Sequence, residues 1–390
     1  MRVALATSFA SVAFALRSAP IPSSNALLQA RISGRPSRTP LRMGDGDARG
    51  GGGPMTRKSL LEVATKTSGV LGAGAFVQKG FFAGVPYYAT PDLSGKAAVI
   101  TGGNTGLGKE TAVRLAQLGA DVTIACRNPD KASAALEDIK AQAPGAQITA
   151  LPLDLASLDS VGSFAKRLSS SSKPLDILVN NAGVMAIPER QATKDGFEMQ
   201  FGTNHLGHFR LTSLLMPALL KSPDARVVSV SSSAHLFAST VEWDDLNAQA
   251  PGAYAPWKAY GLSKLSNIFF AKALQKRVDQ KGASVTCTAL HPGACRTELG
   301  RYLFDPSQPV NPLAYPLLAA ATLVTRTPKQ GAQTQIACAA DPALGIGYKA
   351  GGLYYVGPKN SELPSELARD PEAAERMWAA SEKLVGKFSV

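Results

Sequence analysis

Tyr260 and Lys264 have the residue types and the spacing of an acid–base pair. They are four residues apart, so on a helix their side chains lie on the same face. A phenol, with a reference pKa of about 10, needs help to act near neutral pH, and a neighbouring ammonium favours the phenolate. The pair therefore predicts proton transfer at a substrate oxygen, although the same spacing also occurs by chance on ordinary amphipathic helices.

Two further polar residues are candidates for the same site. Ser232 follows an apolar run, where its hydroxyl can hydrogen-bond a substrate oxygen, and Asn204 can hold a water that connects Lys264 to solvent. The predicted catalytic set is therefore Asn204, Ser232, Tyr260 and Lys264.

A glycine-rich segment between an apolar run and a helical pattern predicts a phosphate cradle. Glycines let the backbone turn tightly and approach a pyrophosphate, and the free N–H groups at a helix start favour its charge. A glycine-rich turn without a ligand is the alternative, but the position between strand and helix favours a dinucleotide. The predicted contacts are Gly102, Asn104, Thr105, Gly106, Leu107 and Gly108.

The end of the second predicted strand indicates which dinucleotide is bound. An NAD enzyme places an acid about twenty residues beyond the glycines, whereas Cys126-Arg127-Asn128 contains none. Arg127 can instead pair with a 2′-phosphate, which favours NADP(H); a solvated loop arginine is the alternative. Ligands bind at the carboxyl ends of strands in open α/β sheets. Such ends also place Asp154, Leu155, Asn181, Ala182 and Gly183 among the cofactor contacts.

Apolar runs alternate with helical patterns from Leu93 onward, which predicts an α/β fold: one doubly wound domain with a seven-stranded, mostly parallel sheet and helices on both faces. The predicted strands are Ala97–Thr101, Asp121–Cys126, Ile148–Asp154, Asp176–Asn180, Arg226–Ser231, Ser284–Leu290 and Leu353–Val356. The predicted helices are Gly106–Leu118, Lys131–Gln142, Leu158–Ser169, Phe201–Leu220, Gly261–Lys281 and Gln330–Ala340.

These motifs occur in the order of the short-chain dehydrogenase/reductase (SDR) family, which the chain resembles from Leu93 to Leu384. The resemblance implies a Rossmann-type fold and hydride transfer between NADP(H) and an alcohol or carbonyl, with Tyr260 as acid and base. It implies that Tyr260 and Lys264 also contact the cofactor. By the same pattern the catalytic serine is Ser232, with Ser231 as the alternative. Pro292, Gly293 and Thr297 complete the implied cofactor contacts.

Within that family, Thr203–Phe209, Val230–His235 and His291–Arg301 resemble the retinol dehydrogenase branch. This branch includes WW-domain oxidoreductases and a dehydrogenase subunit linked to the chloroplast import machinery, and it implies an apolar aldehyde, ketone or alcohol as substrate. Light-dependent protochlorophyllide reductase is a close relative of this branch. It usually has Asn-Ala-Ala where this chain has Asn181-Ala182-Gly183, which weakens the pigment interpretation. The alternatives are a protochlorophyllide reductase-like plastid enzyme and an NADPH-sensing subunit of a plastid membrane complex.

Composition and charge exclude several classes of protein. With 45% hydrophobic and 18% charged residues, the chain is neither disordered nor a polytopic membrane protein. Residues 1–95 hold eleven Lys and Arg and four Asp and Glu, so most of the formal charge of +12 lies there. Because this excess lies outside the predicted domain, we expect no nucleic-acid partner.

The N-terminal region has the composition of a targeting peptide. The first 44 residues contain six Arg and no Asp or Glu, and the uncharged run Val3–Leu16 is too short to span a bilayer. Ala10–Ala15 resembles the cleavage site of the two-part presequences of algae with secondary plastids; a secretory signal or a mitochondrial presequence is the alternative. We therefore expect a plastid location, with membrane association as an option.

The predicted organisation of the chain follows from these segments. Residues 1–55 are a presequence and Gly-rich linker, 56–92 a linker, surface helix or second sorting signal, and 93–390 the NADP-binding domain. The uncharged segment Pro306–Thr325 contains four prolines, which argue against a membrane-spanning helix. Its place in the pattern of the family that the chain resembles implies that it is a substrate lid. Leu317, Leu318, Leu323 and Val324 would then line an apolar pocket, with shallow peripheral membrane contact as the alternative.

The cysteines and histidines predict no metal site. Cys126, Cys287, Cys295 and Cys338 lie in apolar contexts without a Cys-x-x-Cys pair. His205 and His208 are three residues apart on a predicted helix, but no cluster of Cys, Asp or Glu completes a ligand set, so packing and hydrogen bonding are expected instead. The resemblance to the short-chain dehydrogenase/reductase family implies that the protein is a monomer or a homodimer.

Overall fold

One sheet organises the part of the chain that the computed structural model describes, which is residues 87, 89–170, 173–297, 299, 325–344, 354–358, 360–362 and 364–390. The strand order is β3-β2-β1-β4-β5-β6-β7-β8. Seven strands run parallel, and β8 pairs antiparallel with β7. Their bounds are β1 Ala97–Thr101, β2 Asp121–Cys126, β3 Ile148–Pro152, β4 Ile177–Asn180, β5 Ala225–Val230, β6 Val285–Leu290, β7 Tyr354–Gly357 and β8 Asn360–Glu362.

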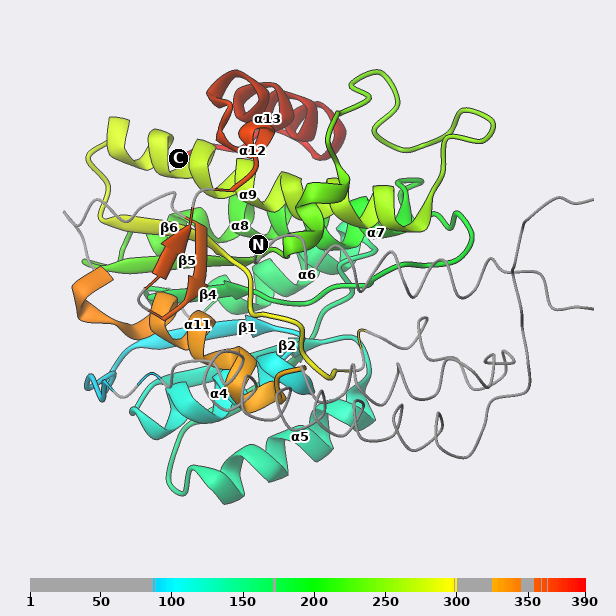
Figure 1. Cartoon of the computed structure of the whole chain (residues 1–390). Coiled ribbons are helices and arrows are strands. Elements are labelled where there is room, and N and C mark those ends of the chain that lie inside the picture. Colours follow the sequence, from blue (N-terminus) through cyan, green and yellow to red (C-terminus); the bar gives the residue numbers. More distant parts are fainter. Residues whose placement is uncertain are drawn as a thin grey trace, which may run out of the picture. The chain divides into compact units, whose positions relative to one another are not determined.

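Helices cover both faces of this sheet (Figure 1), with α6, α8 and α9 on one face and α4, α5 and α11 on the other. This arrangement confirms the predicted doubly wound α/β class. The α-helices are α4 Gly106–Gln117, α5 Pro129–Gln142, α6 Leu158–Ser169, α7 Met199–Phe201, α8 Gly207–Leu219, α9 Pro256–Gln280, α11 Pro328–Ala340, α12 Glu366–Arg369 and α13 Pro371–Val385. The shorter turns are η2 Gly202–Leu206, η3 Ser233–Phe237 and η6 Pro342–Leu344.

The first segments after the strands show why these elements form where they do. Asn128 ends the turn after β2, and its side chain accepts a hydrogen bond from the Lys131 N–H, which caps α5. Thr327 and Gln330 form a reciprocal capping box at the start of α11. All six residues of β5 are buried, as expected for a central strand covered on both faces.

The predicted helix Phe201–Leu220 is confirmed as a continuous helical segment, which contains the π-helical turn η2 between α7 and α8. Two tertiary hydrogen bonds hold Asn204 at the centre of η2: its Nδ2 donates to the Val184 carbonyl and to the Ser263 hydroxyl, both at 2.9 Å. Single π-turns inside helices are frequent at functional sites. The two bonds tie this π-turn to the segment after β4 and to α9.

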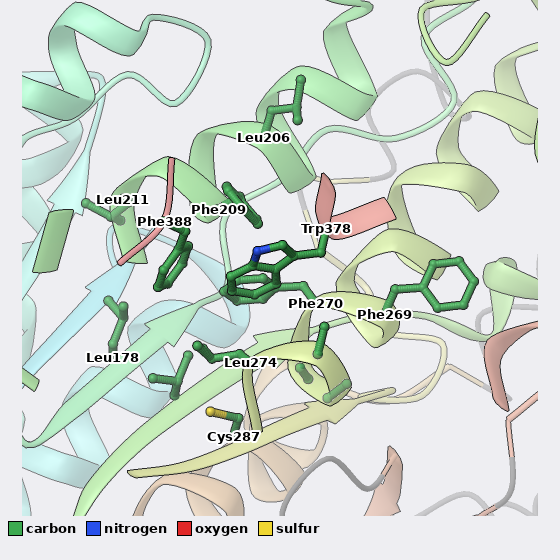
Figure 2. Packing of buried hydrophobic residues seen from close by; sticks show 14 of the residues in the cluster. Leu178, Leu206, Phe209, Leu211, Phe269, Phe270, Leu274, Cys287, Trp378 and Phe388 are labelled. Atoms are coloured by element: carbon green, nitrogen blue, oxygen red, sulfur yellow. The ribbon is translucent and has the colours of Figure 1, made fainter. Parts of the chain in front are cut away.

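The C-terminal helix α13 closes the core on the α9 face and was not among the predicted helices. Trp378 lies 4.9 Å from Phe209 and stacks on Phe270 at 6.0 Å, measured between ring centroids, and Phe388 contacts the same group (Figure 2). Burial of these four aromatic rings packs the C-terminal segment against helices α8 and α9.

The fold extends N-terminal to Leu93. The side chain of Tyr87 is buried against α11, and its backbone N–H donates to Gln333 Oε1 at 2.9 Å. Arg114 donates to the carbonyl of Ala89 at 3.3 Å. Other predicted features fall on residues that the structure does not describe: the presequence, most of the 56–92 segment, and the lid leucines and Val324 within Pro306–Thr325.

No helix within the described ranges is both long and apolar enough to cross a membrane. All four cysteines are free; Cys295 is partly exposed and the other three are buried.

Two glycines test how tightly the helices pack. A Cβ at Gly207, in α8, would lie 2.5 Å from the Leu155 carbonyl oxygen, whereas a Cβ at Gly162, in α6, would meet nothing within 4 Å. We predict that Gly207→Ala lowers the free energy of unfolding by about 1–3 kcal/mol through overpacking. Gly162→Ala should raise it by about 0.5–1 kcal/mol, because alanine is the better helix former. Urea denaturation of the two full-length variants measures both, and equal effects would contradict the packing at Gly207.

Candidate active site

The hydroxyl of Thr101, the last residue of β1, connects the carboxyl end of β1 to the residues that follow β4. The backbone N–H groups of Asn181 and Ala182 donate to Thr101 Oγ1 at 2.9 and 3.0 Å, and His208 Nε2 lies 2.8 Å from the same oxygen. Asn181 Nδ2 donates in addition to the Thr101 carbonyl at 2.8 Å. The strand order reverses between β1 and β4, which is where open α/β sheets bind ligands.

The predicted glycine cradle begins at this point. Gly102 and Gly106 have φ values of +66° and +55°, which L side chains rarely adopt. Thr105, the N-cap of α4, makes no side-chain capping bond, and the first turn of α4 contains no acidic residue. The N–H groups of this turn can therefore donate to an anion. The arrangement fits the pyrophosphate of a dinucleotide.

A cavity of about 230 Å³ lies beside the cradle. It is lined by Asn104, Thr105, Lys109, Lys131, Ala134, Ala135 and Asp138. Lys109 pairs with Asp138 at 2.5 Å. Arg127 is exposed at the end of β2, next to the cap of α5. Lys109 and Lys131 were not among the predicted cofactor contacts, although each lies within the first turn of a helix that follows a predicted phosphate-site residue.

The remaining predicted cofactor residues after β3 and β4 lie at the same edge of the sheet. Asp154 follows β3, where its carboxylate accepts the Ala156 N–H at 3.1 Å, and Leu155 is buried against α8. Gly183 lies between two members of the predicted catalytic set: a Cβ there would be 3.0 Å from Asn204 Oδ1 and 3.6 Å from Lys264 Nζ. A side chain at Gly183 would therefore fill the space in front of Lys264.

Tyr260 and Lys264 lie together on α9, and both are buried. Lys264 Nζ is 5.6 Å from the centre of the Tyr260 ring and donates to the Val230 carbonyl at 3.0 Å. Burial lowers the pKa of Lys264 to about 8. Burial raises the pKa of Tyr260 above its usual range, against a smaller opposing effect of a hydrogen bond with Ser232. In the chain alone, desolvation therefore outweighs the expected help of the ammonium.

The structure distinguishes the two candidate serines. Ser232 Oγ accepts the Ala234 N–H at 3.1 Å, and its hydroxyl is near enough to Tyr260 to lower the pKa of that phenol. Ser231 Oγ donates to the carbonyl of Lys264 at 2.6 Å and is buried, so its hydroxyl is directed into the backbone of α9. Ser232 is the serine that lies beside the phenol.

Asn204 is brought to the same place, but its side chain has protein partners. Its Oδ1 accepts the Val184 N–H, and its Nδ2 donates to the Val184 carbonyl and to the Ser263 hydroxyl. The backbone carbonyl of Asn204 lies 3.0 Å from His208 Nδ1. This geometry gives Asn204 a role in fixing the Gly183–Val184 segment; the predicted water relay stays a prediction.

The loop after β6 approaches the glycine cradle from the other side. Thr297 Cγ2 would lie 3.2 Å from a Cβ placed on Gly106. Gly293 has a φ of +90°, and the Arg326 side chain lies against it while Arg326 Nη1 donates to the Pro292 carbonyl at 2.9 Å. Arg326 was missed by the sequence analysis because it follows the lid segment, far along the chain from the motif that it contacts.

Comparisons with known proteins agree with this geometry. Residues 96–243 match the family model described as short chain dehydrogenase. Retinol dehydrogenase 13 of Homo sapiens is 40% identical over 326 residues, covering 82% of this chain and 93% of that protein. Retinol dehydrogenase 12 of Mus musculus is 41% identical over 306 residues, covering 78% and 91%.

A solved structure supports the same assignment. An uncharacterized protein from Mycobacterium Paratuberculosis superposes with a TM-score of 0.62 at 35% identity, covering 79% of this chain and all of that one. The chain therefore belongs to the short-chain dehydrogenase/reductase family, in the branch that contains the retinol dehydrogenases.

Proposed function

We propose that this oxidoreductase uses NADP(H) to interconvert an apolar aldehyde or ketone and its alcohol. The observation that carries the proposal is the convergence of Ser232, Tyr260 and Lys264 at the carboxyl edge of the sheet, next to the uncapped start of α4. A phenol, a hydroxyl and an ammonium around one space are the groups that proton transfer at a carbonyl oxygen requires.

Each residue has a distinct task in this chemistry. The bound nicotinamide supplies or accepts the hydride. In reduction, Tyr260 donates its phenolic proton to the carbonyl oxygen and Ser232 donates a hydrogen bond to the same oxygen; in oxidation, Tyr260 takes the proton of the alcohol. Burial raises the pKa of Tyr260, which keeps the phenol protonated for reduction. Lys264, with a pKa of about 8, is charged at neutral pH and favours the phenolate as the proton leaves.

The cofactor-binding residues follow from the cradle. The N–H groups at the start of α4 would hold the pyrophosphate, and Thr297, beside Gly106, would lie at the nicotinamide end. Arg127 is the exposed cation at the end of β2, where no acid competes for a ribose hydroxyl, and this favours NADP(H) over NAD(H).

The apolar substrate is proposed from the likeness to retinol dehydrogenases. The predicted lid that would enclose it lies outside the described residues, as does the predicted presequence on which a plastid location depends. No contact among the described residues favours the pigment reductase or the sensing subunit over a carbonyl reductase.

Removal of one hydroxyl tests the proton transfer. Tyr260→Phe is predicted to abolish NADPH-dependent reduction of a panel of apolar aldehydes and ketones that includes retinal, while the dissociation constant for NADPH changes less than about threefold. Tyr87→Phe is the matched control, because Tyr87 is also a buried tyrosine but packs on α11. Turnover is followed by loss of NADPH absorbance, and an active Tyr260→Phe enzyme would refute the assignment. Assays with protochlorophyllide in light and dark test the pigment alternative.

Removal of one cation tests the cofactor preference. Arg127→Ala is predicted to raise the dissociation constant for NADPH by roughly tenfold or more and that for NADH by less than twofold, because only NADPH carries the 2′-phosphate. Lys140→Ala, at the other end of α5, controls for general loss of positive charge. Fluorescence titration measures all four constants. An equal effect of Arg127→Ala on both cofactors would remove Arg127 from the phosphate site.

A further inference from the structure

Two imidazoles contact the peptide group that joins Ser232 to Ser233. The carbonyl of Ser232 lies 2.7 Å from His235 Nδ1. The N–H of Ser233 donates to His291 Nδ1 at 3.2 Å. His235 comes from η3, which follows β5, and His291 directly follows β6. The peptide is therefore held on both sides by side chains from two segments of the chain.

The backbone partners fix a different tautomer on each ring. A carbonyl only accepts, so His235 must carry its proton on Nδ1; a backbone N–H only donates, so His291 must leave Nδ1 bare and carry its proton on Nε2. The second nitrogen of His235 agrees with this assignment, because Nε2 accepts the Ser365 N–H at 3.2 Å. Neither ring can exchange its tautomer without losing a bond to the peptide.

The surroundings keep both rings neutral. Burial lowers the pKa of His235, and burial together with the nearby Arg326 lowers the pKa of His291 to about 3. A protonated His291 would place an N–H against the N–H of Ser233. The His235 ring also packs edge-on against Tyr354, with ring centroids 5.3 Å apart, which restricts its rotation.

The held peptide determines where the Ser232 hydroxyl lies. Ser232 has extended backbone angles, φ −160° and ψ 155°, and its Oγ accepts the Ala234 N–H while its hydroxyl lowers the pKa of the nearby Tyr260. A rotation of the peptide after Ser232 would change ψ and move Ala234 away from Oγ. The hydroxyl would then lose the anchor that directs it toward the phenol.

We propose that His235 and His291 are positioning residues that hold the Ser232–Ser233 peptide in opposite tautomers and so direct the Ser232 hydroxyl at the substrate oxygen. The inference rests on the proposed function, because it assumes that Ser232 contacts that oxygen. It gives a reaction-related task to two histidines that were not among the predicted site residues.

Paired substitutions at each histidine test the proposal in the full chain. Asparagine keeps a donor and an acceptor near the position of Nδ1, whereas leucine is of similar size and has neither. We expect His235→Leu and His291→Leu each to lower kcat for carbonyl reduction about 10- to 100-fold, with the NADPH dissociation constant within twofold of wild type. The two asparagine variants should stay within about fivefold of wild-type kcat. Equal losses in the Asn and Leu variants would show a merely structural role and overturn the proposal, as would fully active Leu variants.

A double-mutant cycle shows whether the histidines act through Ser232. In a Ser232→Ala background, His235→Leu and His291→Leu are expected to lower kcat less than twofold further, because residues that act as a unit are not additive. Full additivity would place the histidines outside the Ser232 function. Melting temperatures of all variants separate this effect from loss of folded protein.

Histidine tautomers give a readout that is independent of turnover. The chain has four histidines, so ¹⁵N-histidine labelling and two-bond ¹H–¹⁵N spectra, assigned with the Asn variants, can resolve each ring. We expect the Nδ1–H tautomer for His235 and the Nε2–H tautomer for His291. The opposite or a mixed assignment would overturn the proposal even in an active enzyme. If wild type reduces no carbonyl, the proposed function fails, and the spectra alone decide whether the peptide is held as described.

Discussion

The Thr101 hydroxyl contacts His208 and two backbone N–H groups at the position where the order of the parallel strands reverses. The carbonyl of Asn204 accepts from His208 Nδ1, so Nε2 of that ring is bare and can accept the proton of the Thr101 hydroxyl, while the N–H groups of Asn181 and Ala182 donate to its oxygen. Burial lowers the pKa of His208 to about 4, which preserves this pattern at neutral pH. The glycine cradle begins at Gly102, directly after Thr101. Its position relative to β4 and η2 therefore depends on the hydrogen bonds of the Thr101 hydroxyl.

The sequence predicted the regular elements well because local patterns determine them. The predicted bounds of β1, β2 and α6 agree with the structure, since buried strands and amphipathic helices show in the spacing of their apolar residues. The π-turn at Asn204 could not be predicted, because it depends on Val184 and Ser263, far along the chain. Helix α13 was not predicted, although its buried residues recur at helical spacing, so this omission does not reflect a missing local signal.

The residues of the candidate site could be predicted from the sequence, but the pKa shifts of these residues could not. Motif order was enough to expect Ser232, Tyr260 and Lys264 at one edge of the sheet, because parallel strands all end there. Burial of the phenol and the ammonium arises from the tertiary structure. It raises the pKa of Tyr260 and lowers the pKa of Lys264, so it favours the neutral form of each group. The partners of His235 show the same limit, since Ser365 is 130 residues away.

Tyr87 sets a limit on how much of the N-terminal segment the fold can lose. Its side chain is buried and its backbone N–H is bonded to Gln333, so a cut on its C-terminal side would detach a packed tyrosine and expose the apolar surface of α11 around Ala332 and Ile336. A truncation that leaves this packing intact has to end before Tyr87. The seven Lys and Arg among the first 50 residues lie N-terminal to that limit. A chain cut between the two would keep Tyr87 in its packed position and would lose a net charge of between +5 and +8 of the total of +12, because the removed part carries seven to eleven Lys and Arg and two or three Asp and Glu.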